Sequence, residues 1–458
     1  MNSIHLIQRK FTSPLPTPKT TEYYGSAIAV SPTGDRFAVG ESGFHNGGNH
    51  PIGGVHCYDI VKNNTQLDFT IQQTLLHKNR ISHSMFGSTV AFSQDGQTMV
   101  IAAPNQNNGK NPVVGRVFVY RLGVKNGIEV WKLRDELAPQ TTYSQSLLGA
   151  SLLVLQNGHL IVVGAPGAYA DSGRVYFFQK QDDDHWSEVR DVSTMDSYNE
   201  TRFGFSLSGS EDGKTIVVGS ERGNRVFVFR YDDSPFIKTW VEEKLFVYAY
   251  GPAAGRKVIL INRDKDRWDE TTVRRLSAGA DKTGMVVKVS KDGKQLVAIT
   301  RTVLPDVKNI IGYTAVRDSE TNEWSDVQPL TISLNTDRYA GTVYLTLAAN
   351  LDFTELAISV CTGDFIRDAK FNVKPNGVYI YRNPTGHHWL ECGKIYPPKE
   401  DDHRLFGYAM EYIPATNYLF ITNPMANAED NQDADTGAIY LANTVFVAEI
   451  ADYTPAIG

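Results

Sequence analysis

The residues best suited to hold a metal ion lie in the acidic segment 428–437, which reads AEDNQDADTG. Asp430, Asp433 and Asp435 place three carboxylates within six residues. Calcium is bound by about six to eight oxygen ligands, several of them from carboxylates. We therefore name these three aspartates as candidate metal ligands, with calcium as the cation, and expect no other cofactor. The alternative interpretation is a charged surface loop without a metal.

Motifs for catalysis are weak by comparison. The segment GSEDGKT (209–215) is one residue short of the phosphate-binding pattern G-x-x-x-x-G-K-[ST], and it joins two predicted strands instead of leading into a helix. The sequence contains no G-x-S-x-G nucleophile motif. We therefore predict no catalytic residues and no enzymatic activity. A hydrolase or lyase stays open as an alternative, because acids gathered from distant segments leave no linear motif.

Composition and charge narrow the class of partner. Lys and Arg number 45 against 51 Asp and Glu, a net charge of −6. This balance argues against a nucleic-acid partner, which calls for a basic surface. The sequence has no apolar run of about 18 residues for a membrane span, and its first residues do not form a secretory signal. We expect a protein that does not span a membrane and is either intracellular or assembled onto a particle.

An apolar or aromatic residue followed by glycine begins a pattern that recurs along residues 1–458. The copies begin near residues 24, 86, 148, 203, 283, 340 and 406, and neighbouring copies are 55 to 80 residues apart. Nine residues after the glycine, four copies carry Asp-Gly or Asn-Gly. These dipeptides between apolar runs are strong signals for a tight hairpin. Each copy therefore begins with two antiparallel strands.

Two further strands complete each copy. A third strand opens with a glycine, as in GRVFVY (115–120) and GRVYFF (173–178), and the six tryptophans lie 12 to 17 residues after such glycines. A four-stranded unit cannot bury both of its faces alone, whereas seven arranged radially can. The sequence thus predicts an all-β fold, a seven-bladed β-propeller of four-stranded antiparallel blades, forming a single domain.

Two segments fall outside the regular copies. Residues 4–11 alternate like an outer strand, and we predict that they pair with the last unit and close the propeller. Residues 244–276 carry an extra glycine-to-tryptophan stretch within the longest copy. We interpret this segment as an inserted or degenerate hairpin on blade four or five. An eighth, truncated blade is the alternative.

The repeats resemble the FG-GAP family, the propeller of integrin α-chains and of many microbial surface proteins. The resemblance rests on FGSTVAFSQDGQTMVIAAP (86–104) followed by GRVFVY, and on LGASLLVLQNGHLIVVGAP (148–166) followed by GRVYFF. It implies a seven-bladed propeller with a binding or adhesive role and no catalytic residues. The calcium loops of many integrin-type repeats are missing from the first hairpins, so metal-dependent recognition of the integrin kind is not expected.

Long polar loops between the second and third strands are the predicted binding surface, because loops on a rigid scaffold commonly carry function. Within the loops 41–53, 104–114, 361–376 and 424–437, and the corresponding loop of the third unit, we name as partner-binding candidates Phe44, His45, Asn46, Tyr169 and Phe365. The partner is a protein or a glycan. We expect a non-enzymatic interaction propeller that is a structural component of a larger assembly, such as a virion or a surface appendage. A stand-alone carbohydrate-binding or adhesive propeller is the alternative.

Overall fold

The computed structural model describes the strands and most of the turns between them. The described residues are 7–14, 22–45, 50–63, 66–77, 79, 81–107, 113–181, 184–193, 201–221, 225–232, 239–251, 255–262, 285–300, 309–321, 323–333, 343–362, 377–383, 389–398, 405–428 and 431–445. Among them, no helix is long and apolar enough to cross a membrane.

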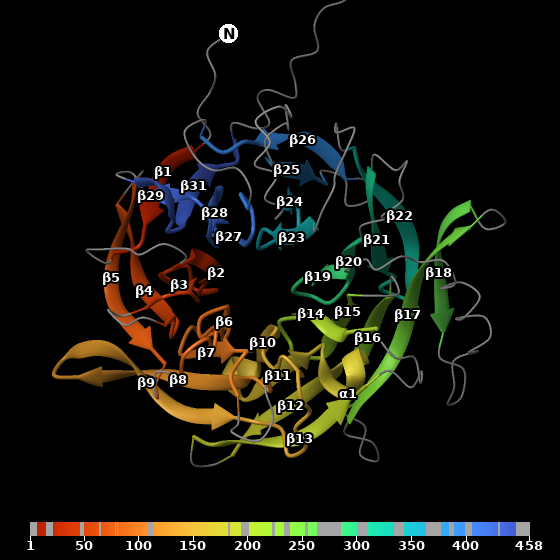
Figure 1. Cartoon of the computed structure of the whole chain (residues 1–458). Coiled ribbons are helices and arrows are strands. Elements are labelled where there is room, and N and C mark those ends of the chain that lie inside the picture. The colour runs from red at the N-terminus through yellow and green to blue at the C-terminus, as the bar shows by residue number, and fades with distance from the viewer. Residues whose placement is uncertain are drawn as a thin grey trace, which may run out of the picture. The chain divides into compact units, whose positions relative to one another are not determined.

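The chain is a seven-bladed β-propeller, and each blade is an antiparallel sheet (Figure 1). The strands are paired in chain order in blades 1 to 6, whereas in blade 7 the N-terminal strand is the outermost. The predicted fold class is confirmed. Blade 1 holds β2 (Tyr24–Val30), β3 (Arg36–Glu41), β4 (Gly54–Asn63) and β5 (Gln66–Leu76); blade 2 holds β6 (Thr89–Phe92), β7 (Thr98–Ala103), β8 (Arg116–Lys125) and β9 (Ile128–Leu137); blade 3 holds β10 (Ser151–Leu155), β11 (Leu160–Ala165), β12 (Arg174–Lys180) and β13 (Trp186–Val192).

Blades 5 and 6 follow the same order, blade 4 has a fifth strand, and blade 7 takes its outer strand from the N-terminal segment. Blade 4 holds β14 (Phe203–Gly209), β15 (Thr215–Ser220), β16 (Arg225–Asp232), β17 (Thr239–Gly251) and β18 (Gly255–Asn262); blade 5 holds β19 (Met285–Val289), β20 (Gln295–Thr300), β21 (Asn309–Arg317) and β22 (Trp324–Ser333); blade 6 holds β23 (Val343–Ala349), β24 (Glu355–Thr362), β25 (Gly377–Arg382) and β26 (Leu390–Ile395); blade 7 holds β27 (Met410–Tyr412), β28 (Tyr418–Asn423), β31 (Ala438–Asn443) and β1 (Ile7–Thr12).

Residues 244–276, where an extra hairpin was predicted, begin in blade 4. There β17 is the fourth strand of the blade, and it also pairs along its length with β18, which becomes a fifth strand at the edge of that sheet. Residues 263–276, including Trp268, lie outside the described part of the chain.

The blades form two compact units. The first unit contains residues 1–90 and 336–458, and the second contains residues 91–335. In the first unit β1 pairs with β31, with Phe11 opposite Ile439, so the N-terminal strand completes the last blade as predicted. Arg9 of β1 also donates a hydrogen bond to the carbonyl of Leu67 in blade 1 (2.9 Å). The N-terminal strand β1 and the last strand β31 thereby share one sheet.

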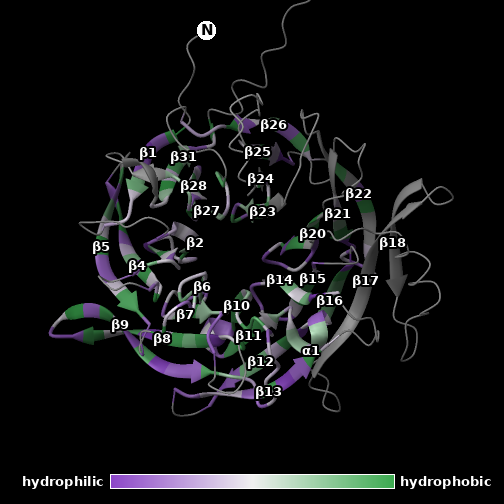
Figure 2. Cartoon of the chain, in the orientation of Figure 1, coloured by the Kyte–Doolittle hydropathy of each residue, from purple (hydrophilic) through white to green (hydrophobic). Residues whose placement is uncertain are grey.

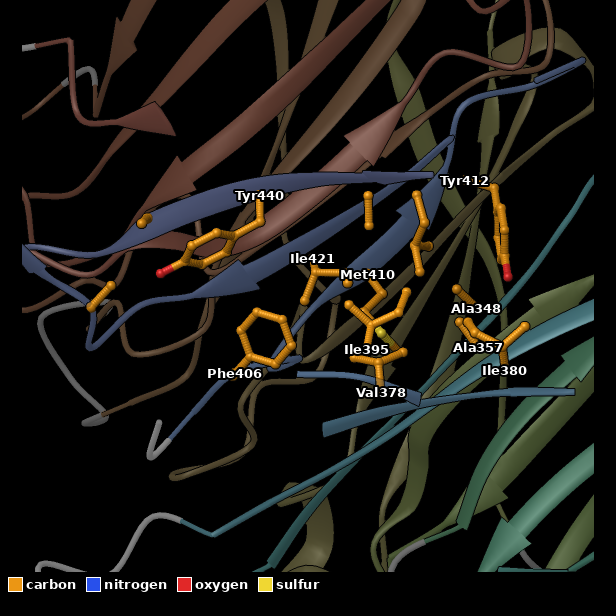
Figure 3. Close-up of a cluster of buried hydrophobic side chains, with 14 residues drawn as sticks. Ala348, Ala357, Val378, Ile380, Ile395, Phe406, Met410, Tyr412, Ile421 and Tyr440 are labelled. Atoms are coloured by element: carbon orange, nitrogen blue, oxygen red, sulfur yellow. The ribbon is translucent and has the colours of Figure 1, made fainter. Parts of the chain in front are cut away.

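Within each unit, neighbouring blades bury apolar side chains between them. Figure 3 shows the cluster between blades 6 and 7, where Phe406 meets Tyr440 edge-on with ring centres 5.4 Å apart. Burying one side chain of this size stabilises a fold by about 1.5–3 kcal/mol. The remaining labelled members of this cluster are Ala348, Ala357, Val378, Ile380, Ile395, Met410, Tyr412 and Ile421. In contrast, the outer strand β13 is mostly hydrophilic (Figure 2), because its far side is not covered by another blade.

The recurring glycines are explained by the joints between blades. Gly173, at the entrance to β12, has a φ of +85° and lies against the backbone of Phe203, the first residue of blade 4. The amide of Phe203 donates to the carbonyl of Ser172 (3.1 Å). In the first unit, Gly437 has a φ of +89° and meets Tyr24 in the same way. Only glycine combines this positive φ with so close an approach of two backbones.

The first hairpins of three blades share one kind of turn. In blades 2, 4 and 5 a serine hydroxyl donates to the aspartate two residues on (2.5 Å) and accepts the amide five residues on (2.9 Å). Such side-chain bonds to a local backbone amide are typical of serine in turns. The serines are Ser93, Ser210 and Ser290, and the glycine of each Asp-Gly pair has a φ between +65° and +71°. The Asp-Gly pairs therefore form hairpin turns, as their sequence predicts.

Candidate functional site

The predicted residues of the loop between β3 and β4 lie largely inside the protein. Phe44 is only 5% exposed, and its ring meets that of His56 edge-on at 6.3 Å. The His45 side chain is also mostly buried, and its Nδ1 lies 4.0 Å from a carboxylate oxygen of Glu22. Phe44 thus anchors its loop and does not offer its ring to a partner. The candidates Asn46 and Phe365 lie outside the described residues.

A fully buried polar cluster lies beneath that loop. Glu41 and His56 have no exposed side-chain surface, and Nε2 of His56 lies 2.5 Å from Oε2 of Glu41. Nδ1 of His56 lies 3.0 Å from the hydroxyl of Thr74, and the hydroxyl of Ser13 donates to Glu41 (3.3 Å). Because Ser13 directly follows β1, this cluster ties the closing strand to blade 1. Its burial keeps any substrate away, so its role is structural.

The acidic segment forms a small hairpin. Asp433 and Asp435 lie in β30 (Asn431–Asp435), which pairs with β29 (Asn427–Ala428), whereas Asp430 lies outside the described residues. Within the described part of the chain, no three acidic, histidine or cysteine side chains are grouped so that they could hold a metal. Calcium binding by these three aspartates therefore stays a prediction.

A different arrangement is found on blade 3, in the second unit. Tyr143 comes from the connection that enters the blade, and Tyr169 comes from the short helix α1 (Ala168–Asp171, yellow in Figure 1) between β11 and β12. Their rings are nearly perpendicular, at 87°, with centres 5.9 Å apart. The guanidinium carbon of Arg174 lies 5.4 Å from the centre of the Tyr143 ring and 5.9 Å from that of Tyr169. We call Tyr143, Tyr169 and Arg174 the tyrosine shelf.

The backbone that carries Tyr169 is strained. Tyr169, Ala170 and Asp171 are consecutive and all have φ between +52° and +63°, in the left-handed region. This conformation costs about 1–2 kcal/mol for each residue that is not glycine. Strained residues of this kind gather at functional sites, where the surrounding structure holds them in place. The result here is a large aromatic side chain that is 60% exposed.

Backbone hydrogen bonds hold this turn at both of its ends. The amide of Gly167 donates to the carbonyl of Ser146 (3.1 Å), which ties the turn to the connection that carries Tyr143. The amide of Arg202 donates to the carbonyl of Asp171 (2.8 Å), which ties it to blade 4. The position of Tyr169 is therefore set by three segments that are distant in sequence.

The charges around the shelf are paired, with an excess of acids. Arg174 forms an ion pair with Asp191, and Arg202 forms ion pairs with Glu221 and Asp171. Counted together, these two groups contain two arginines and three carboxylates. The carboxylates are partly exposed, so they keep acceptor capacity for another molecule. The surroundings of the shelf thus favour a neutral or basic ligand over an acidic one.

Beside the shelf, Tyr143 packs against a buried hydrophobic cluster that includes Tyr176. Tyr176 of β12 is 2% exposed, and burial is the main cause that raises the pKa of its hydroxyl, against the lowering effect of Arg174. Among the described residues, that hydroxyl has no hydrogen-bond partner. A buried hydroxyl in this state costs about 1–3 kcal/mol. Tyr143 therefore packs against a cluster whose buried tyrosine stays protonated at neutral pH.

Sequence reasoning identified Tyr169 alone among these residues. Tyr143, Arg174 and Arg202 come from separate segments, and no linear pattern groups them. The available signal was the loop GAPGAYADSG (164–173), where an aromatic residue stands among small residues between two predicted strands.

Comparison with known proteins supports the fold. No protein-family model matches the sequence, and no curated protein matches it significantly. A structure described as "COPII on membranes, outer coat vertex" superposes with a TM-score of 0.51 at 9% identity, covering 92% of this chain and 84% of that one.

Two further structures superpose less closely. The β-propeller domain of Cps50 (Swd1) from Myceliophteria thermophila has a TM-score of 0.48 at 11% identity and covers 95% of this chain and 99% of that one. The periplasmic gluconolactonase PpgL of Pseudomonas aeruginosa has a TM-score of 0.46 at 14% identity, with 87% and 97% covered. At such low identity, similarity in structure speaks for the fold alone.

Proposed function

We propose that this protein is a non-enzymatic interaction propeller that binds a macromolecular partner through the tyrosine shelf, as a structural component of a larger assembly such as a virion or a surface appendage. The observation that carries the proposal is the exposed Tyr169, held on three consecutive left-handed residues. A strained backbone that presents a large aromatic side chain to solvent is costly unless that side chain is used. Tyrosine and arginine are also the residues that most often dominate binding energy at interfaces.

Two further observations support a binding role within an assembly. The charged groups beside the shelf are engaged in ion pairs with one another, which suits recognition better than proton transfer. The fold is also found in a structure described as "COPII on membranes, outer coat vertex", which supports a role within an assembly. We further propose that the repeats are of the FG-GAP type, in which the aromatic-glycine step forms the joint between blades.

The proposal is tested by isolating the protein under mild conditions from its source organism. Light scattering gives the mass of the isolated species, and mass spectrometry identifies the companions. Three forms are compared: the natural protein, Tyr169→Ala, and the control Val124→Ser, which changes a 65% exposed side chain at the end of β8. We expect the natural protein and the control in a large assembly of fixed stoichiometry, and Tyr169→Ala as a free chain. A natural protein that runs as a single chain contradicts the proposal.

A further inference from the structure

The geometry of the tyrosine shelf limits what can lie on it. The two rings stand at 87°, so a ligand that touches both meets two apolar surfaces at a right angle. A flat ligand can stack on only one of them. A rod with ridges can contact both, and the polyproline II helix is such a rod, with about three residues per turn. Proline-rich segments dock in aromatic-lined grooves for this reason, and their preformed helix lowers the entropy cost of binding.

The charges near the shelf favour a basic residue in that segment. Asp171, Asp191 and Glu221 outnumber Arg174 and Arg202, and all three carboxylates are partly exposed. An arginine of the bound segment would lie beside these carboxylates and over the exposed face of Tyr169. A cation within about 6 Å of the centre of a tyrosine ring is attracted to the face of that ring. An acidic residue would meet the local excess of negative charge and be disfavoured.

Taken together, these observations identify the occupant. We propose that the tyrosine shelf binds an extended, proline-rich segment of a partner protein, with a basic residue placed next to Asp171 and Glu221. This inference rests on the proposed function, because it specifies the partner chemistry of the same site. Tyr143 and Tyr169 form the walls that hold the prolines. Arg174 packs over one side of both rings, which fixes the angle between them, and it is itself neutralised by Asp191.

The test uses synthetic peptides and the full chain. The probes are a fluorescently labelled all-proline peptide capped at both ends by arginine, the same peptide capped by glutamate, and a glycine-serine peptide of equal length. Binding is measured by fluorescence anisotropy. We expect the arginine-capped peptide to bind with a dissociation constant below about 1 mM. The glutamate-capped peptide should bind at least about tenfold more weakly, and the glycine-serine peptide should not bind.

Variants assign the binding to the shelf. Tyr169→Ala should weaken binding of the arginine-capped peptide by at least about tenfold, as expected for a tyrosine at the centre of an interface. Tyr169→Phe keeps the ring and should bind like the natural protein, as should Val124→Ser. Because Tyr169 is exposed, its replacement leaves the fold intact, and an unchanged unfolding midpoint confirms this.

Three outcomes overturn the inference: no peptide binds below the millimolar range, the two capped peptides bind equally, or Tyr169→Ala binds as well as Tyr169→Phe. Binding of neutral oligosaccharides on a glycan array, lost in Tyr169→Ala while the peptides fail, assigns the shelf to sugars and also overturns it. Failure here is separable from failure of the proposed function. If Tyr169→Ala leaves the native assembly but the peptides do not bind, the assembly role stands and only the peptide chemistry is wrong.

Discussion

Replacing Gly173 by alanine should destabilise the protein far more than the addition of one methyl group suggests. Two features of the position cause this. Its φ of +85° is a conformation that alanine adopts poorly, and a Cβ built there would lie 2.8 Å from the carbonyl carbon of Phe203 and closer still to its nitrogen and oxygen. The atoms in the way are backbone atoms of the next blade, so no side-chain rotation relieves the overlap.

The magnitude follows from three contributions. The positive φ costs an alanine about 1–2 kcal/mol. Forcing an extra methyl group into packed structure costs about 1–3 kcal/mol. The hydrogen bond from the amide of Phe203 to the carbonyl of Ser172 is weakened as the blades separate, which costs about 0.5–1.5 kcal/mol. We therefore expect a loss of about 2.5–6.5 kcal/mol in the free energy of unfolding, against a total stability of about 5–15 kcal/mol.

Gly127 supplies the matched control. It has a similar φ of +77° at the turn between β8 and β9, but a Cβ there would have nothing within 4 Å. Gly127→Ala should therefore lose only the conformational contribution, about 1–2 kcal/mol. Both variants are compared by urea unfolding, followed by circular dichroism. Equal losses for Gly173→Ala and Gly127→Ala would refute the argument that the joint between blades is crowded.

Three further outcomes are expected. Ala170→Gly relieves a left-handed residue and should raise the free energy of unfolding by about 1 kcal/mol in urea unfolding, whereas a decrease would show that the turn is not strained. Burial raises the pKa of the Tyr58 hydroxyl to about 12 and holds that of Tyr24 well above 10, so the stability that comes from these protonated hydroxyls is complete below pH 10 and is lost as the pH rises towards 12. Unfolding measured across this pH range should show a steep fall that is reduced when both residues are replaced by phenylalanine; an equal fall in the double variant argues against the assignment. Ser210→Ala removes the acceptor for the amide of Thr215 and should cost about 1–2 kcal/mol in urea unfolding, and no change would mean that the serine does not hold the turn.

The fold could be predicted because its causes are local and repeated. An Asp-Gly pair forms a hairpin wherever it stands between apolar strands, and Gly173 and Gly437 each meet the start of a blade through the same close approach. In a repeat protein the same turn and the same close approach recur several times, so the residues that they require recur in the sequence and can be recognised. The fifth strand of blade 4 has no such repetition, and the sequence alone did not show that β17 pairs on both of its edges.

The site could be predicted only in part because its causes are not local. Phe44 and Tyr169 both lie in glycine-rich loops between second and third strands, yet one is buried and the other exposed. The difference comes from what lies beneath each loop. His56 in blade 1 leaves room for the Phe44 ring, whereas in blade 3 three left-handed residues turn Tyr169 outwards. Neither the buried histidine nor the backbone conformation can be inferred from the loop sequence.

Gly173, at the joint between blades 3 and 4, and Tyr169 of the tyrosine shelf lie in one loop. A distortion of the backbone at Gly173 should therefore displace Tyr169. Tyr169 stands four residues before Gly173, and the carbonyls of Asp171 and Ser172 between them accept hydrogen bonds from Arg202 and Phe203 of the next blade. Gly173→Ala displaces these hydrogen bonds and should weaken binding of the arginine-capped peptide by about tenfold, although Gly173 is not part of the tyrosine shelf.

Gly437→Ala is the control for this effect. A Cβ there would lie 2.8 Å from the carbonyl carbon of Tyr24, the same distance as at the Gly173 joint, but in the other compact unit. Gly437→Ala should therefore lose a similar amount of stability, about 2.5–6.5 kcal/mol, and bind the peptide unchanged. If both variants weaken binding equally, the effect is one of general stability. If neither variant weakens binding, the position of Tyr169 does not depend on the joint at Gly173.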